Sequence, residues 1–286
     1  MLTALTLLLL SGFNAVIPTT APTLETLVLF QEQEEEQQPV EVEKEEEKAP
    51  TPEEAIAGLE AAKKAKNPLD LALALEVFGS IEGKAVVKFV SKLLKDKDDG
   101  IRLEAIKALR WNPHPDATKE LVKQKKNKKI TENRECGVEY IYALGQKGGS
   151  KCLDILTDGL RYTAADGIKQ RIQAIGRIRD IDSVEALMSL MTSGKGRRDS
   201  APNMNDLRVS LKVLTGEDLG RKSIDWIQWW NKNRKSLKIS AEPWPLDKRQ
   251  QFQWDKLWAS PKEKEDMKKK AQKNLKETDE KESDEF

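Results

Sequence analysis

Apolar residues recur along the middle of this chain at the spacing of one buried helix face. In residues 102–110 (RLEAIKALR) and 171–179 (RIQAIGRIR), a small Ala is followed four positions later by a large aliphatic residue. Residues 71–79 (LALALEVFG) show the same pattern, and residues 137–145 (GVEYIYALG) show it with Tyr140 in place of Ala. Apolar positions three and four residues apart share one side of an α-helix, so each copy predicts an amphipathic helix.

The copies return at a nearly constant interval. Their anchors are separated by 31, 35 and 34 residues, and they are Phe78, Leu109, Leu144 and Ile178. A short breaker and then a second apolar-periodic stretch follow each anchor, and the breakers are residues 80–83, 112–115, 148–149 and 179–182. Two helices per unit at this period predict stacked helical hairpins. The expected fold is all-α, an α-α superhelix without a sheet.

Changes in amino-acid composition and helix-start signals predict the boundaries between regions of the chain. A Glu-rich stretch without aromatic residues predicts a disordered linker, because it has too little apolar surface to repay the entropy of ordering. The T-P-E-E sequence at residues 51–54 predicts a capping box at the start of the first helix. The predicted regions are residues 1–30 (signal peptide or N-terminal anchor), 31–50 (acidic disordered linker), 51–192 (helical repeats), 193–259 (Trp-rich capping region) and 260–286 (charged, largely disordered tail).

A tryptophan-rich segment follows the repeats. Because the last hairpin of a solenoid has no neighbour, its exposed face requires a cover. Trp226, Trp229 and Trp230 in residues 223–233 are predicted to form this structural cap, and a platform for a cofactor or sugar is the alternative. Further on, Trp254, Leu257 and Trp258 form a second apolar edge. We expect that edge to fold back on the body of the protein.

Two segments resemble a known family. Residues 98–110 (DDGIRLEAIKALR) resemble the first helix of short HEAT-like repeats in their aspartate turn, Arg102, Ala105 and Leu109. The L-T-G…W-x-x-W-W block in residues 207–234 is similar to the C-terminal segment of extracytoplasmic bacterial HEAT-repeat proteins. The resemblance implies a HEAT-like solenoid and a non-catalytic scaffold that mediates protein–protein interaction.

Charge makes one surface distinctive. The chain has 49 Lys+Arg and 48 Asp+Glu, so it lacks the overall basic character of a dedicated nucleic-acid binder. Two rows of lysines nevertheless recur at helical spacing in neighbouring repeats, and they are Lys84, Lys88, Lys92, Lys95 and Lys119, Lys123, Lys126. Stacking of the repeats would combine the rows into a basic stripe. The stripe is either a solvated outer face or a binding site for an acidic partner or for the chain's own residues 32–47.

Residue chemistry favours no catalytic site. His114, the sole histidine, lies between two prolines in a predicted turn. Cys136 and Cys152 are expected to be small buried side chains too far apart for a disulfide. We therefore predict no enzyme activity, no cofactor and no metal site. HEAT-like lyases and a DNA-glycosylase family that uses a HEAT solenoid keep an enzyme open on fold analogy alone.

The N-terminus suggests a location. The first 17 residues are apolar enough for the core of a signal peptide, and the small residues Ala15 and Ala21 lie where cleavage could occur. We predict export to the periplasm or cell envelope, with an uncleaved anchor and a cytoplasmic protein as alternatives. The predicted function is a scaffold that binds a protein partner along its second helices. Anion or nucleic-acid binding through basic helix faces is the alternative, and membrane contact is expected only through an uncleaved N-terminal segment.

Overall fold

The computed structural model describes residues 50–65, 68–160, 165–192 and 202–284, and the regular elements within these ranges are all helical. They are α1 (Pro52–Ala65), α2 (Pro68–Val77), α3 (Lys84–Leu93), α4 (Asp99–Trp111), α5 (Pro115–Lys123), the 3₁₀ turn η2 (Gln124–Lys126), α6 (Lys128–Thr131), α7 (Arg134–Lys147), α8 (Ser150–Thr157), α9 (Ala165–Arg177), α10 (Ile181–Thr192), α11 (Met204–Thr215), α12 (Ser223–Asn233), α13 (Lys248–Trp258) and α14 (Pro261–Asp284). The predicted N-terminal segment, and the acidic linker up to residue 49, lie outside the described residues.

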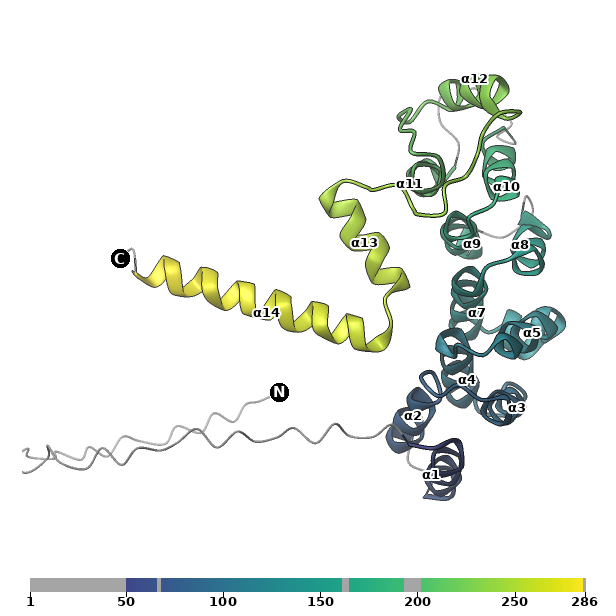
Figure 1. The fold of residues 1–286 in the computed structure, drawn as a ribbon, viewed down its shortest axis with the longest axis vertical. Coiled ribbons are helices and arrows are strands. Elements are labelled where there is room, and N and C mark those ends of the chain that lie inside the picture. Colours follow the sequence, from purple (N-terminus) through teal and green to yellow (C-terminus); the bar gives the residue numbers. More distant parts are fainter. Residues whose placement is uncertain (1–49, 66–67, 161–164, 193–201, 285–286) are drawn as a thin grey trace, which may run out of the picture. The chain divides into compact units, whose positions relative to one another are not determined.

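Helical hairpins stack in two layers. Figure 1 shows α2, α4, α7, α9 and α11 in one row and α3, α5, α8 and α10 in the other, and α12 packs on α10. We call these the first-helix layer and the second-helix layer. Helix α1 packs against both α2 and α3 and covers the first hairpin. The predicted all-α superhelix of stacked hairpins is confirmed.

Small residues let neighbouring first helices approach closely. A Cβ added at Gly145 in α7 would lie 2.8 Å from the Cβ of Ala174 in α9. A Cβ added at Gly176 in α9 would lie 2.5 Å from the Cβ of Ser210 in α11. Close backbone approach brings more atoms into van der Waals contact, so these glycines set the spacing of the first-helix layer.

The repeats extend further than the sequence predicted. Helix α11 packs on α9 and α12 packs on α10, so these two helices extend the stack by a fifth pair, whose anchor Leu214 lies 36 residues after Ile178. Ser210 takes the place of the small Ala, and its hydroxyl donates to the carbonyl of Ile172 at 3.1 Å. The predicted boundary at residue 192 therefore falls between the fourth and fifth pairs of one stack. The sequence pattern did not identify this fifth copy, because the polar residue Ser210 stands where the other copies have Ala or Tyr.

Two arginines close turns between repeats, and Arg102 is buried whereas Arg171 is partly buried. Arg102 and Arg171 occupy the same position in two copies, seven residues before their anchors. Arg102 donates to two carbonyls of the preceding turn at 2.8 and 3.1 Å, and Arg171 donates to two carbonyls at the end of α8 at 2.7 and 3.3 Å. A guanidinium carries five N–H donors, so one side chain satisfies several carbonyls that a helix end leaves unpaired.

Polar side chains also tie repeats together at the other end of the first helices. Asn112, after α4, donates from Nδ2 to the carbonyls of Phe78 and Ile81, both at 2.8 Å. Lys147, at the end of α7, donates to the carbonyl of Asn112. Burial lowers the pKa of Lys147 to about 8. Each tie links one repeat to the one before it.

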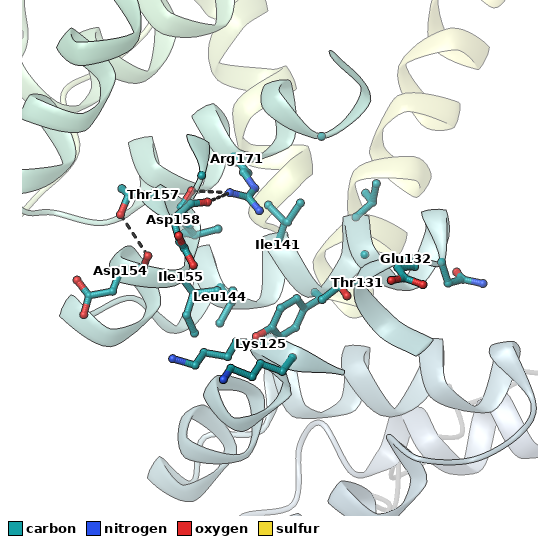
Figure 2. A pocket seen from close by; sticks show the side chains of 18 of the residues that line it. Lys125, Thr131, Glu132, Ile141, Leu144, Asp154, Ile155, Thr157, Asp158 and Arg171 are labelled. Carbon is teal, nitrogen blue, oxygen red and sulfur yellow. Dashed lines mark hydrogen bonds between the residues drawn. The ribbon is translucent and has the colours of Figure 1, made fainter. Parts of the chain in front are cut away.

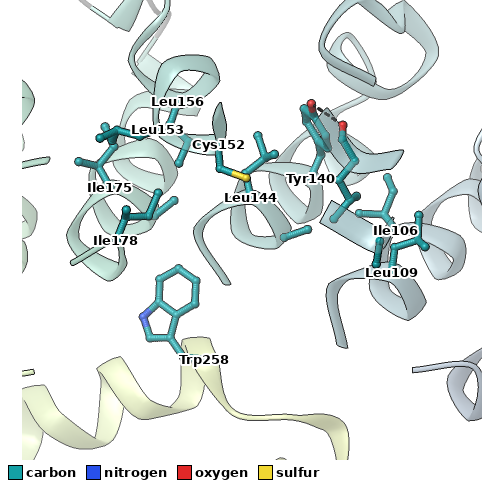
Figure 3. Close-up of a cluster of buried hydrophobic side chains, with 14 of the residues drawn as sticks. Ile106, Leu109, Tyr140, Leu144, Cys152, Leu153, Leu156, Ile175, Ile178 and Trp258 are labelled. Carbon is teal, nitrogen blue, oxygen red and sulfur yellow. Dashed lines mark hydrogen bonds between the residues drawn. The ribbon is translucent and has the colours of Figure 1, made fainter. Parts of the chain in front are cut away.

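Helix α13 covers part of the first-helix layer. Trp254 and Trp258 are buried, and Figure 3 shows Trp258 extending from α13 toward an aliphatic cluster that includes Leu144 and Ile178. The rings of Trp258 and Tyr142 meet edge to face with centroids 5.7 Å apart. The predicted second apolar edge therefore does fold back on the repeats.

Arg110 of α4 fastens α13 in place. Its guanidinium donates to the carbonyl of Leu257 at 2.6 Å and pairs with Glu139 at 3.0 Å. It also lies 5.7 Å from the ring centroid of Trp258. Arg110 is only 3% exposed, and burial of a charge costs free energy unless the charge has partners. A carboxylate, a carbonyl and aromatic faces surround its guanidinium and offset this cost.

Capping boxes begin both terminal helices. Thr51 N–H donates to the Glu54 carboxylate at 2.8 Å, and Glu54 N–H donates to the Thr51 hydroxyl at 3.3 Å, as predicted. Ser260 and Glu263 form the same pair at 2.6 and 3.2 Å and start α14. Helix α14 runs through the charged tail from Pro261 to Asp284. Its cap and lysine–glutamate pairs at helical spacing support a helix without an apolar stripe.

Candidate functional site

The seven predicted stripe lysines all lie exposed on the first two second helices or just after them. Helix α3 carries three of them and the following turn one, α5 carries two, and η2 carries the last, and they are Lys84, Lys88, Lys92, Lys95, Lys119, Lys123 and Lys126. Two have an acidic neighbour one turn away on α5: Lys119 pairs with Asp116 and Lys123 with Glu120, both at 2.6 Å. The second-helix layer therefore presents amino groups to solvent in its first two repeats.

Electrostatic coupling shows that the two rows are neighbours. The hydrogen bond from Lys119 lowers the pKa of Asp116 from its ordinary value, and the positive charge of Lys84 on α3 contributes to the same shift. Helices α3 and α5 also pack directly on one another. The stacking that the sequence predicted thus places the two lysine rows side by side.

A groove lies at the end of these rows, where α3, α5 and α6 meet. Six lysines line it, and they are Lys92, Lys95, Lys123, Lys126, Lys128 and Lys129, together with a single acidic residue, Glu120. We call this the lysine groove. Sequence reasoning missed Lys128 and Lys129, although the run KQKKNKK at residues 123–129 was a usable signal. Lys84, Lys88 and Lys119 lie outside the groove.

The floor of the groove is fixed by amide side chains. Gln124 is buried, and its Nε2 donates to the carbonyl of Glu120 at 3.2 Å. Asn127 donates from Nδ2 to the Gln124 side-chain oxygen at 2.9 Å and to the carbonyl of Leu94 at 3.2 Å. These bonds join α3, α5 and η2 beneath the lysines, so the relative positions of the helix ends are set by hydrogen bonds rather than by the charged side chains.

The basic surface does not continue along the second-helix layer. Helix α8 carries one exposed lysine, Lys151, and one exposed aspartate, Asp154. Helix α10 presents Asp182 and Glu185 and contains no basic residue. Positive potential is therefore concentrated on the first two repeats.

A second groove runs between α7 and α8, and several of its polar groups bond to the fold. Three cations at its edge have side chains that form no hydrogen bond or ion pair within the described part of the chain, and they are Lys125, Lys126 and Arg134. Figure 2 shows Arg171 hydrogen-bonded to the end of α8 and Thr157 hydrogen-bonded to the backbone of Asp154, at 3.3 Å in the latter case. Tyr140, also in this groove, donates its hydroxyl to the carbonyl of Leu121 at 3.0 Å, and burial raises its pKa. This groove therefore offers an apolar wall with structural polar contacts at its ends.

Residues with reactive side chains also have structural positions. His114 caps the N-terminus of α5, where its Nδ1 accepts a hydrogen bond from Asp116 N–H at 3.1 Å. Both cysteines are free and buried, as predicted, and burial raises the pKa of Cys136 and that of Cys152, the latter to about 11. A protonated thiol is a poor nucleophile and metal ligand. Within the described ranges, the structure contains no group of three or more His, Cys, Asp or Glu residues arranged to hold a metal ion.

The three tryptophans of the predicted cap differ in how far they are buried. Trp226 is completely buried, and its indole N–H donates to the carbonyl of Gly220 at 3.0 Å. Trp229 and Trp230 are only partly buried, although the three rings contact one another in sequence. Because α12 packs on α10 at the end of the stack, Trp226 fills the position expected of a cap. The other two rings keep part of their surface open to solvent.

Known families identify the class of fold. The stacked hairpins define an α-solenoid, and residues 56–135 match the sequence model of a family described as HEAT repeats. The matched range includes α3 and α5, which carry the lysine rows. The fold is therefore an all-α, HEAT-like solenoid, a class whose members generally act as protein-interaction scaffolds. No curated protein matches this chain.

Proposed function

We propose that this chain is a non-catalytic scaffold that binds a protein partner through its second-helix layer. The HEAT repeats support the general role, since stacked hairpins offer an extended surface for protein recognition. The choice of layer rests on one observation. Helix α13 of the chain itself covers the first-helix layer around α4, α7 and α9, whereas the lysines on α3 and α5 are exposed.

The structural contacts of the histidine, the cysteines and two arginines support a role without catalysis. His114 caps a helix, and the thiols of Cys136 and Cys152 are held protonated by burial. Arg102 and Arg171 donate to the carbonyls that end helices. A catalytic site requires an acid, base or nucleophile that is free to reach a substrate, and each of these groups is committed to the fold.

We further propose that the protein acts at the bacterial cell envelope. The apolar segment at the N-terminus supports export, and the L-T-G…W-x-x-W-W block supports a relationship to extracytoplasmic HEAT-repeat proteins. Among the described helices, none is both long and apolar enough to span a bilayer. Cell fractionation and N-terminal sequencing of the purified protein test the location. Cytoplasmic protein that retains Met1 would contradict export.

Photo-crosslinking in cells tests the binding surface. A photoreactive amino acid replaces Lys88 on α3 in one variant and Phe252 on α13 in the other, since both side chains are exposed. The proposal predicts a discrete adduct with one protein from Lys88 and none from Phe252, with the partner identified by mass spectrometry and confirmed with purified protein. Adducts from Phe252 alone would place the partner on the other side. The absence of adducts from both positions would contradict the scaffold.

A further inference from the structure

The lysine groove concentrates positive charge that the fold does not neutralise. Lys92, Lys95 and Lys126 make no ion pair with any residue in the described part of the chain, whereas Lys123 pairs with Glu120 and Lys128 pairs with Glu132. Like charges that gather without counter-charges repel one another, and this repulsion is relieved when an anion binds between them. The groove therefore favours a negatively charged occupant.

The kind of residue lining the groove narrows the chemistry of that occupant. Its cations are all lysines, and arginine and aromatic side chains are absent from its lining. Arginine side chains bind phosphates in a fixed two-point geometry. Aromatic side chains stack on nucleic-acid bases. Lysine is a point charge on a flexible stem, which adapts to carboxylates whose positions vary along a peptide.

The neighbouring repeats limit the length of the occupant. Helices α8 and α10 present Asp154, Asp182 and Glu185 on the same layer, with Lys151 as their single exposed lysine. A long polyanion that continued from the groove along the second helices would meet these carboxylates, and like charges there disfavour it. A short acidic stretch confined to the first two repeats avoids them.

We infer that the lysine groove binds a short Glu- or Asp-rich segment of the partner protein. This inference rests on the proposed function, and it adds the chemistry of the partner. The segment lies between the ends of α3 and α5 and the start of α6, with its carboxylates paired to Lys92, Lys95 and Lys126. The amide network of Gln124 and Asn127 keeps the groove open before the segment arrives.

Binding of a defined probe tests this inference with the full-length chain. The probe is a short fluorescent Glu-rich peptide, and the measurement is its anisotropy at low and at physiological salt. Two triple variants of equal charge change are compared: Lys92→Gln/Lys95→Gln/Lys126→Gln in the groove, and Lys84→Gln/Lys88→Gln/Lys119→Gln on the same layer outside it. Exposed ion pairs are individually weak, so loss of three of them should make the groove variant bind about tenfold more weakly, which equals about 1.4 kcal/mol, and the control should bind less than about threefold more weakly.

Three results would overturn the inference. The first is absence of peptide binding both by the wild-type chain and by a full-length chain in which the glutamates of residues 32–47, which would compete with the probe, are changed to glutamine. The second is an equal loss in both triple variants, which would mean diffuse attraction to the whole stripe. The third is tighter binding of a single-stranded oligonucleotide with the same number of charges, weakened by the same groove variant, which would make the occupant a nucleic acid.

Failure here and failure of the scaffold role are distinguishable. If the peptide does not bind but photo-crosslinking from Lys88 still captures one protein, the scaffold stands and its partner lacks an acidic segment for this groove. If neither experiment detects binding, the proposed function fails as well. Circular dichroism of both triple variants, with unchanged helix content, ensures that lost binding reflects lost charge.

Discussion

The two layers of this solenoid are built from different kinds of contact. In the first-helix layer, Gly145 and Gly176 bring helix backbones together, and buried arginines bond helix ends and aromatic rings. In the second-helix layer, the exposed charged side chains of α3 and α5 are lysines, and the two carboxylates of α5, Asp116 and Glu120, are partly buried. The cations of the two layers thus have separate uses. Arg110 joins elements of the fold and the lysines of α3 and α5 remain on the surface, whereas Lys147 of α7 is a partly buried lysine that also joins two repeats.

This division separates the residues that hold the protein together from those that can bind a partner. Arg110 cannot be exchanged without disturbing the contact between α4 and α13, because its guanidinium bonds the carbonyl of Leu257 and lies over the ring of Trp258. An exposed lysine such as Lys88 makes no comparable contact. Substitutions in the first layer should therefore change stability, and substitutions in the second layer should change binding.

The largest expected effect is on the attachment of α13. Trp258→Ala removes a buried ring that contacts Tyr142 and Gly145, and loss of a buried Trp costs ~3–5 kcal/mol. The free energy of local opening of α13, measured by hydrogen exchange, should fall by about this amount. Phe252→Ala on the same helix is the control, because Phe252 is 55% exposed and should change opening by less than ~0.5 kcal/mol. Equal effects would mean that α13 does not rest on Trp258.

The second prediction concerns the spacing of the first helices. Gly176→Ala places a Cβ 2.5 Å from that of Ser210, so α9 and α11 must separate, and overpacking of this kind costs ~1–3 kcal/mol. Gly58→Ala in α1 is the matched control, since a Cβ there meets nothing within 4 Å and alanine favours a helix by about 1 kcal/mol. Denaturant unfolding should show opposite signs for the two variants. Stabilisation by both would show that the first-helix layer is loosely packed.

A third prediction follows from the burial of Lys147 in the same layer. Burial lowers its pKa to about 8, so between pH 8 and the ordinary lysine value the unfolded chain binds more protons than the folded one. Stability contributed by this group therefore rises with pH, by up to ~1 kcal/mol between pH 8 and 9. Cys152 acts oppositely only above the ordinary thiol pKa, because burial raises its pKa to about 11.

Lys147→Met isolates this contribution, since methionine retains the aliphatic stem without a titratable group. The difference in unfolding free energy between wild type and variant should change over pH 8 to 9 and stay constant between pH 6 and 7. A difference that does not vary across pH 8 to 9 would mean that the Lys147 amino group is solvated.

The spacing of apolar residues was sufficient to predict the helical hairpins, but it did not predict which of them helix α13 packs against. Apolar spacing located the helices of four repeats, because each helix needs one buried face whatever its neighbours are. The contact between Arg110 and Trp258 joins residues 148 positions apart, and no periodicity encodes it. The Trp254 and Trp258 pair indicated an apolar edge without indicating which helices it would cover.

For the candidate site, the sequence likewise predicted the lysine rows but not the lysine groove. Helical spacing placed the lysines of α3 and α5 in two rows, and stacking brought the rows together. The groove arose from the short turn η2–α6, which inserts Lys128 and Lys129 between two repeats where the hairpin pattern is interrupted. Of the three tryptophans of the predicted cap, Trp226 is buried, and Trp229 and Trp230 pack partly buried against the core. Spacing alone could not show this difference, because it does not reveal how much of each ring a neighbouring helix covers.

The smallest expected effect is the sharpest test of the difference between the layers. Lys84, Lys88 and Lys92 are spaced four residues apart on α3, so Lys88 has a like charge one turn away on either side. Such pairs destabilise a helix by ~0.2–0.5 kcal/mol each, and opposite charges stabilise it by similar amounts. Lys88→Gln, which removes both repulsive pairs, should therefore stabilise the protein by about 0.5 kcal/mol at low salt. Lys88→Glu should stabilise it by roughly twice as much, because it also makes two attractive pairs, and 1 M salt should abolish both gains because it screens the charges. Thermal unfolding at the two salt concentrations measures this directly. If Lys88→Glu instead destabilises the protein as strongly as Gly176→Ala, the α3 lysines serve the fold, and the second-helix layer cannot be the surface left free for a partner.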